Sequence, residues 1–198
     1  MAGPPFVGLT GGIAAGKSEA LRALEELGAA TLSTDAVVHE LLATEELRDA
    51  LVERLGPDVA PGGSVDRSAV AELAFGDPEH REWLEGLLWP KVGNRVMEWR
   101  SRVEDADPSP RAAVVEVPLL FEAGMEQAFD HTLAVVAEES VRDERAEARG
   151  HKAVASRTGR QLSQTEKAQR ADFVVRNDGS LEELKQALSR FLETIGRP

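Results

Sequence analysis

Short apolar runs alternate along the chain with longer segments in which apolar residues recur every three or four positions. The short runs predict buried strands, and the periodic segments predict amphipathic helices. We predict five strands, over residues 6–9, 29–33, 112–117, 132–137 and 172–176. Strands that alternate with helices are typical of a three-layer α/β/α domain built on a parallel sheet.

One long helical stretch, residues 36–105, interrupts this alternation between the second and third strands. Its pattern predicts a helix over 36–55, a short helix after Asp66, and a helix from Asp77-Pro78 to about Val103 that Pro90 interrupts. We therefore predict a helical subdomain inserted into the sheet domain. The predicted core comprises residues 1–35, 106–139 and 172–198, and residues 140–171 form a separate basic segment.

The loop after the first strand carries a specific chemical pattern. Residues 11–18, Gly-Gly-Ile-Ala-Ala-Gly-Lys-Ser, fit the phosphate-loop pattern G-x-x-x-x-G-K-[ST] and contain no G-x-G-x-x-G dinucleotide spacing. Gly11 and Gly16 let the backbone pass close to phosphate oxygens, so that loop amides and a helix N-terminus face an anion. Lys17 supplies a positive charge for the β- and γ-phosphates, and the Ser18 hydroxyl can ligate Mg²⁺. This stretch predicts a P-loop nucleoside-triphosphate site.

Asp35 follows the second predicted strand directly. Open α/β sheets bind ligands beyond the carboxyl ends of their strands, so Asp35 could orient or deprotonate a substrate hydroxyl, or hold Mg²⁺ through water. The alternative is that Asp35 caps a helix that begins near Ala36, a position that Asp suits well. The residues alone leave both interpretations open.

Composition and charge narrow the class of protein. A net charge of −12 argues against general binding to nucleic acid or to anionic membranes. The absence of cysteine excludes disulfides and thiolate metal sites but leaves the compartment open. The N-terminus has no basic segment followed by a long apolar one, and no apolar run is long enough to span a membrane, so we expect a cytoplasmic protein. Residues 142–176 nevertheless hold nine Lys or Arg against five Asp or Glu, which suggests a local phosphate site.

Phosphate-loop proteins of this size are mostly small-molecule kinases, GTPase switches or ATPase modules. A GTPase should carry Asn-Lys-x-Asp, which is absent, and large ATPases add oligomerisation segments for which this chain has no room. A small-molecule kinase needs a lid of arginines that closes over the phosphates and excludes water, and the basic segment suits that task. The insert, residues 36–105, suits recognition of the acceptor. A non-catalytic ATP-binding module is the alternative outside the kinases.

Several further blocks resemble those of dephospho-CoA kinases. The blocks are Val7–Ile13 with Gly16–Ser18, Asp66-Arg67, Pro118–Glu122, Arg145 with Arg149, Arg157 with Gln161–Ser163, Lys167, and Ala171–Val174 with Asn177 and Gly179-Ser180. This resemblance covers nearly the whole chain. It implies transfer of phosphate from ATP, with Mg²⁺, to the ribose 3′-hydroxyl of dephospho-CoA, the last step of coenzyme A synthesis. A kinase of the nucleoside-monophosphate type is the runner-up.

The resemblance also implies individual roles. Asp35 is implied to be the catalytic base, Lys17 to stabilise the transferring phosphoryl group, and Arg149 to be the lid arginine. The implied ATP-binding residues are Gly11, Gly12, Ile13, Ala14, Ala15, Gly16, Lys17, Ser18, Glu19, Arg145, Arg149 and Asn177. The implied acceptor-binding residues are Asp35, Arg67, Leu119 and Phe121, and Ser18 is the metal ligand.

Five positions depart from the family pattern. Ser33, Trp89 and Glu116 stand where Asp, His and Asp are usual. Ala14-Ala15 replace the usual Gly-Ser, which keeps the amide donors but demands ordinary backbone angles at residue 14. The loop around Ala14 is therefore where we look first for a distortion.

Overall fold

The computed structural model describes residues 3–148 and 161–196, and these divide into two compact units. The first comprises Met1–Ser33 and Arg100–Pro198, and the second comprises Thr34–Trp99. The two units are described separately below.

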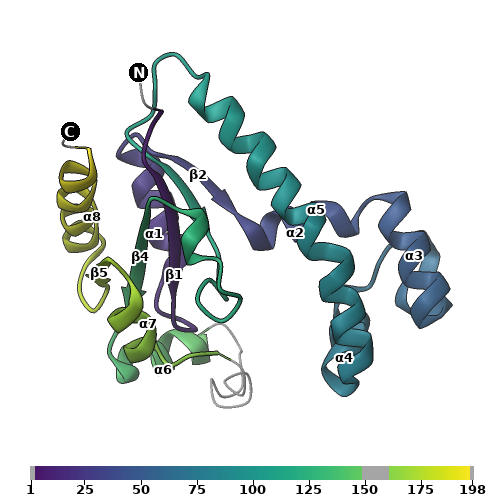
Figure 1. Cartoon of the computed structure of the whole chain (residues 1–198). Helices are drawn as coiled ribbons and strands as arrows, with labels where there is room; N and C mark the ends of the chain where they lie inside the picture. The colour runs from purple at the N-terminus through teal and green to yellow at the C-terminus, as the bar shows by residue number, and fades with distance from the viewer. Residues whose placement is uncertain (1–2, 149–160, 197–198) are drawn as a thin grey trace. The chain divides into compact units, whose positions relative to one another are not determined.

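A five-stranded parallel sheet forms the centre of the first unit (Figure 1). Its strands are β1 (Phe6–Gly11), β2 (Ala30–Ser33), β3 (Ala113–Glu116), β4 (His131–Val136) and β5 (Phe173–Arg176). They lie in the order β2-β3-β1-β4-β5, and every neighbouring pair is parallel. All five predicted strands are therefore present, within one or two residues at each end. The strand that precedes the phosphate loop is the central one, and all six of its residues are buried.

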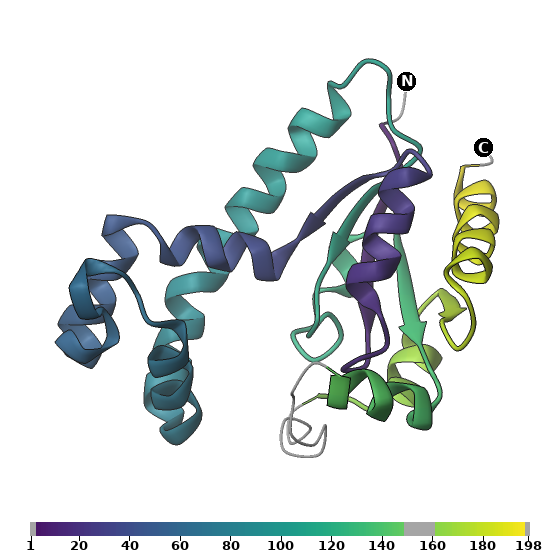
Figure 2. The ribbon, with the colours of Figure 1, turned by 180° about the vertical axis from the view of Figure 1, so that it is seen from behind.

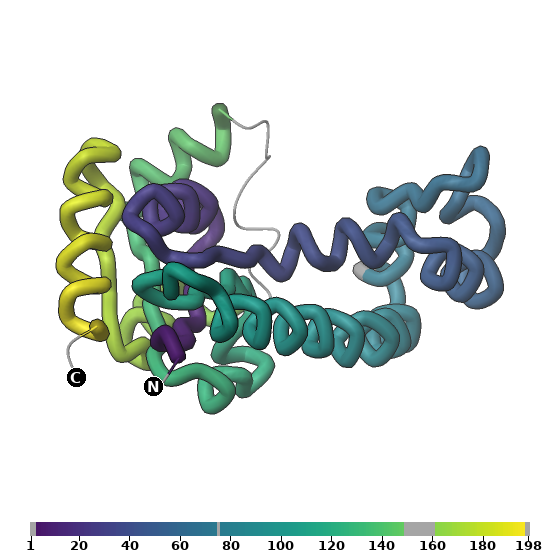
Figure 3. Tube along the Cα trace, turned by 90° about the horizontal axis from the view of Figure 1, so that it is seen from above, coloured from purple at the N-terminus to yellow at the C-terminus, as the bar shows by residue number. Residues whose placement is uncertain are grey.

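Helices cover both faces of this sheet. Figure 2 shows α1 (Lys17–Glu26) in front of the strands, and Figure 3 looks nearly down its axis, with α8 (Leu181–Ile195) beside it. Leu24, Leu188 and Leu192 from these helices pack with Val7 and Val135 of the sheet in one buried cluster. The other face carries α7 (Gln164–Arg170), with α6 (Glu139–Ala148) preceding it in the chain. The α/β/α fold class predicted from the sequence is confirmed.

Two helices of the first unit begin at an N-terminal cap. Ser163 and Ser180 each form a capping box with a glutamate three residues later. The hydrogen bonds from the serine hydroxyl and amide lower the pKa of both carboxyl groups, Glu166 and Glu183. These two boxes set where α7 and α8 begin.

The second unit is helical, with a small core of its own. It contains α2 (Thr34–Leu42), α3 (Glu45–Leu55), the short 3₁₀ turns η1 (Pro57–Val59) and η2 (Pro61–Gly63), α4 (Arg67–Gly76) and most of α5 (Pro78–Glu104). Leu47, Leu51, Val59 and Val70 are buried together, and their packing stabilises these short elements. A third 3₁₀ turn, η3 (Glu126–Ala128), belongs to the first unit.

Two predictions in this region are wrong in detail. The single helix predicted over 36–55 is two helices, because Thr44 caps α3 by accepting a hydrogen bond from the Leu47 amide at 3.4 Å. The predicted interruption at Pro90 is absent, because α5 is one helix of 27 residues that contains Pro90. Leu88 and Val92 are buried on either side of Pro90, so packing offsets the hydrogen bond that proline cannot donate.

Candidate active site

The phosphate loop connects the end of β1 to the start of α1, at the centre of the sheet. A side chain at Gly11 would place its Cβ 2.2 Å from the carbonyl oxygen of Val135, and one at Gly16 would lie 2.0 Å from Nδ2 of Asn177. Gly16 also has φ 94° and ψ 29°, a left-handed conformation that suits glycine. Both glycines of the pattern are thus required by close approach to other strands and loops.

Ala14 contradicts the expectation of ordinary backbone angles at this position. Its φ is +59°, and no other non-glycine residue has a positive φ in the part of the chain that the structure describes. Such a conformation costs an L-residue roughly 1–2 kcal/mol. The loop therefore keeps a glycine-like turn with an alanine in it, and the methyl group carries the strain.

Lys17 folds back over the loop. Its ammonium donates hydrogen bonds to the carbonyl oxygens of Gly11 at 3.3 Å and Gly12 at 3.2 Å. Ser18 is exposed on the first turn of α1, and its carbonyl oxygen accepts a hydrogen bond from Arg22. The positive end of the helix, one mobile ammonium and one exposed hydroxyl are therefore gathered around the same turn, which suits a polyphosphate.

Asn177 supports this loop from inside the protein. Its side chain is 2% exposed, and Nδ2 donates to the Ala15 carbonyl oxygen at 3.0 Å and to Oε2 of Glu19 at 3.4 Å. The carbonyl oxygen of Asn177 accepts a hydrogen bond from Arg145 at 2.9 Å. Three residues predicted to bind ATP are thus brought together with the loop. Their contacts here are with the protein, and Asn177 acts as a brace beneath the loop.

Two residues at the loop were missed from the sequence. Nε of Arg142, on α6, donates to the Ile13 carbonyl oxygen at 2.9 Å. Gln164, at the start of α7, lies against Gly12 and pairs with both the amide and the carbonyl of Ala137 at 3.2 and 2.7 Å. Their partners are far away in the sequence, so no local motif marks them. The predicted lid residue Arg149 lies outside the described residues.

The loop after β3 contains the apolar run Pro118–Phe121. Leu120 is fully buried and Phe121 is 3% exposed, with the guanidinium of Arg170 4.8 Å from its ring centroid. Leu119 is partly buried. Internal packing therefore accounts for Leu120 and Phe121, which leaves Leu119 as the more accessible of the two apolar residues predicted to contact the acceptor.

Asp35 and Arg67 both belong to the second unit and are exposed. The helix α2 begins at Thr34, so Asp35 lies inside its first turn, and within the described residues its carboxylate makes no hydrogen bond or ion pair. The alternative that Asp35 caps this helix is therefore wrong. Arg67 is the first residue of α4, which Asp66 caps through the amides of Ser68 and Ala69.

The donors near the loop fit Mg²⁺ better than a metal held by protein ligands alone. The described residues contain no cluster of three or more His, Asp or Glu side chains that could hold a metal ion. Ser18 offers a hydroxyl oxygen, and Glu116, 5% exposed, ends the strand next to β1. Mg²⁺ commonly binds one or two protein oxygens and takes its other ligands from phosphates and water.

A parallel sheet with a phosphate loop after its central strand defines a P-loop nucleoside-triphosphate-binding protein. The family model for dephospho-CoA kinase matches residues 5–183. The chain belongs to the dephospho-CoA kinase family, as its sequence predicted.

Individual relatives agree with this assignment. The dephospho-CoA kinase of Protochlamydia amoebophila is 35% identical over 193 residues, which cover 96% of this chain and 95% of the relative. That of Thermus thermophilus is 37% identical over 195 residues, or 97% and 92% of the two chains. The crystal structure of TT1252 from Thermus thermophilus has a TM-score of 0.83 at 37% identity and covers 98% of each chain.

No helix among residues 3–148 and 161–196 is both long enough and apolar enough to cross a membrane.

Proposed function

We propose that this chain transfers the γ-phosphoryl group of ATP to the ribose 3′-hydroxyl of dephospho-CoA, giving coenzyme A and ADP. The observation that carries the proposal is the braced phosphate loop at the centre of the sheet, in a chain that belongs to this family. The acidic chain carries no general signal for nucleic acid, and we place the activity in the cytoplasm, where ATP is available.

ATP binds on the phosphate loop. The loop amides and the start of α1 receive the phosphates, and the Lys17 ammonium moves from the carbonyls of Gly11 and Gly12 to the β- and γ-oxygens. Ser18 would hold Mg²⁺, which would neutralise part of the phosphate charge. Arg145 and Arg149, both in the basic segment (residues 140–171), neutralise the rest of the phosphate charge. This segment closes over the phosphates and excludes water.

Asp35 takes the proton of the acceptor hydroxyl. Its carboxylate is exposed and makes no hydrogen bond or ion pair among the described residues, so it is available to a substrate. Arg67, in the helical insert (residues 36–105), and Leu119, in the loop after β3, bind the acceptor. General-base catalysis needs a carboxylate within hydrogen-bond reach of the hydroxyl.

An ADP-release assay with a panel of acceptors tests the proposal. We expect turnover with dephospho-CoA and none above background with nucleosides, shikimate or adenylylsulfate. Turnover confined to another acceptor would make the chain a different small-molecule kinase. Tight binding of ATP without any transfer would make it a non-catalytic module.

A further inference from the structure

Lys167 is a buried charge that the function described so far does not use. It lies on α7, its side chain is 0% exposed, and its ammonium is enclosed by the protein. Lysine is almost never fully buried unless it is paired, because removing an ammonium from water is costly. The partners of this ammonium therefore show what its burial accomplishes.

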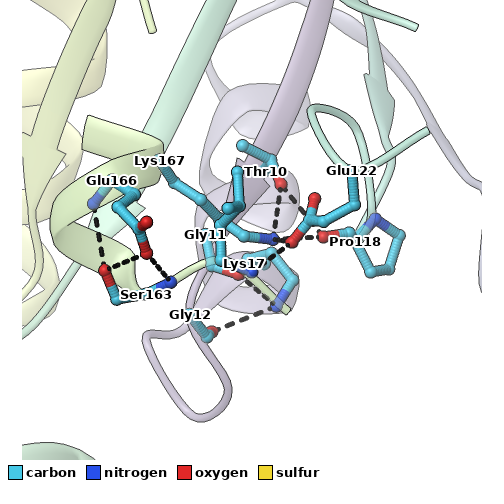
Figure 4. A network of polar contacts seen from close by, with 10 residues as sticks. Thr10, Gly11, Gly12, Lys17, Pro118, Glu122, Ser163, Glu166 and Lys167 are labelled. Carbon is cyan, nitrogen blue, oxygen red and sulfur yellow. Dashed lines mark hydrogen bonds and ion pairs between the residues drawn. The ribbon is translucent and has the colours of Figure 1, made fainter. Parts of the chain in front are cut away.

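The ammonium joins three separate segments (Figure 4). It donates to the Pro118 carbonyl oxygen at 2.5 Å, lies 3.5 Å from Oγ1 of Thr10, and pairs with Oε1 of Glu122 at 3.0 Å. Oγ1 of Thr10 donates to the same Pro118 carbonyl at 3.2 Å. Thr10 immediately precedes Gly11, so the network ends at the residue just before the phosphate loop.

Glu122 extends the network to the start of α7. Its Oε1 also accepts a hydrogen bond from the Leu162 amide at 2.9 Å, and its side chain is 12% exposed. Leu162 precedes Ser163, the cap of α7. Oε1 of Glu122 thus connects the loop after β3 to the residue before the cap of α7, within the basic segment (residues 140–171). Lys167 connects the same loop to Thr10, next to the phosphate loop.

Stability alone is a weak reason for such a pair. Replacing a buried ion pair with uncharged residues of similar volume is often neutral or stabilising, whereas removing one partner strands the other charge. A network of hydrogen bonds in a dry interior does, however, hold its members in one arrangement. This pair therefore fixes the positions of the residues it joins rather than adding to stability.

We infer that Lys167 is a positioning residue for phosphoryl transfer, with Glu122 as its counter-ion. Together they fix the phosphate loop against the loop that carries Leu119 and against the base of the basic segment. The inference rests on the proposed function. It requires that losing the pair slow the transfer step more than it weakens ATP binding, because a misplacement of about 1 Å can cost about 10²-fold in rate.

The first experiment removes both charges together, in the full chain. In the Lys167→Met/Glu122→Gln variant the new side-chain amide oxygen at position 122 can still accept from the Leu162 amide. We expect the melting temperature to stay within a few degrees of the wild type, the Kd of a non-hydrolysable ATP analogue to change less than about threefold, and kcat with dephospho-CoA to fall at least about 10-fold. The matched control is Lys185→Met/Glu26→Gln, which removes an exposed Lys–Glu pair on α8 and α1.

The second experiment restores the ammonium. The chain contains no cysteine, so a Lys167→Cys variant has a single thiol. Alkylation of that thiol in denaturant with 2-bromoethylamine, followed by refolding, rebuilds a lysine-length ammonium, and alkylation with 1-bromopropane gives a neutral side chain of the same length. We expect the ammonium form to regain most of the lost kcat and the propyl form to stay slow, with rates corrected for the fraction that binds the ATP analogue.

The outcomes separate the inference from the function beneath it. Wild-type kcat in the double variant, or equal recovery with both alkyl groups, overturns the role of Lys167 and leaves the proposed function intact. A fall in kcat that matches the loss of folded protein makes the pair merely structural and also overturns it. A wild-type chain that does not phosphorylate dephospho-CoA contradicts the proposed function itself.

Discussion

Polar side chains around the phosphate loop are bonded to the protein, whereas the predicted acceptor-binding side chains of the second unit are exposed. Around the loop, Asn177, Arg142 and Lys17 all bond to loop carbonyls, and Asn177 is buried. In the second unit, Asp35 and Arg67 are exposed. The Lys17 ammonium and the side chains that brace the loop are already held by protein, whereas Asp35 and Arg67 of the second unit face solvent.

This contrast predicts which substitutions change ATP affinity and stability and which change turnover. A residue that braces the loop contributes to its shape, so its loss should change ATP affinity and stability. An exposed residue that meets only the acceptor should change turnover and leave stability alone, because surface substitutions away from such contacts are usually within about ±0.5 kcal/mol. The predictions below run from the largest expected effect to the smallest.

Asp35→Asn tests the exposed side of the contrast. We expect kcat to fall about 10²–10⁴-fold, the usual contribution of a general base, with ATP affinity and the free energy of unfolding unchanged. Steady-state kinetics and a denaturant titration measure these quantities. Glu40→Gln, at an exposed position of the same helix, controls for loss of charge. Near-normal turnover in Asp35→Asn would remove the base from the mechanism.

Gly16→Ala tests the braced side. The new methyl group would meet Nδ2 of Asn177 at 2.0 Å, and the left-handed backbone alone costs about 1–2 kcal/mol, so we expect ATP affinity to fall at least ~10-fold. Titration with a non-hydrolysable ATP analogue measures the change. Gly62→Ala is the matched control, since Gly62 has φ 68° with nothing within 4 Å of its Cβ position. It should lower stability without changing ATP affinity, and equal losses of affinity in both variants would contradict the role of Asn177.

Ala14→Gly should relieve the strain in the loop. A left-handed alanine costs about 1–2 kcal/mol and an added glycine costs about 0.5–1 kcal/mol, so we expect a rise of about 0.5 kcal/mol in the free energy of unfolding. Ala15→Gly, at a fully buried neighbour, should instead lower it by about 1–2 kcal/mol. Denaturant titrations compare the two. A loss of stability in both variants would show that residue 14 is unstrained.

Glu183→Gln probes a brace that is exposed to solvent. Because the folded pKa of Glu183 lies below its ordinary value of 4.5, the carboxylate stabilises the fold above pH 4.5, and this contribution is lost as the pH falls through the lowered pKa. We expect a small loss of stability in the variant at pH 7 that disappears in acid. Glu182→Gln, in the same turn but outside the capping box, should show a smaller loss at pH 7. The same pH dependence in both variants would assign the effect to the helix dipole.

Local signals predicted most of the fold. The apolar runs identified all five strands, and Asp66 marked a helix start because an N-cap acts on amides two or three residues away. The break at Thr44 was missed because the apolar stripe continues across it. Pro90 was read as an interruption because burial of its neighbours cannot be seen in a local pattern.

The candidate site could be predicted only where a motif is contiguous. Residues 11–18 form such a motif, and the resemblance added Asp35 and Asn177. Arg142 and Lys167 were not assigned to the site because their partners, Ile13 and Thr10, are 129 and 157 positions away. Only the strand order, with β1 between β3 and β4, brings these residues to one loop.

The brace formed by Asn177 also has a consequence for synthesis. The Ala15 carbonyl is made 162 residues before its donor, which follows the edge strand β5 directly. A nascent chain that has emerged only as far as β4 lacks that donor, as well as Lys167 and the whole of α8. The nucleotide site therefore matures only after β5 has been made, and a ribosome-bound fragment should hold ATP poorly until that strand has left the exit tunnel.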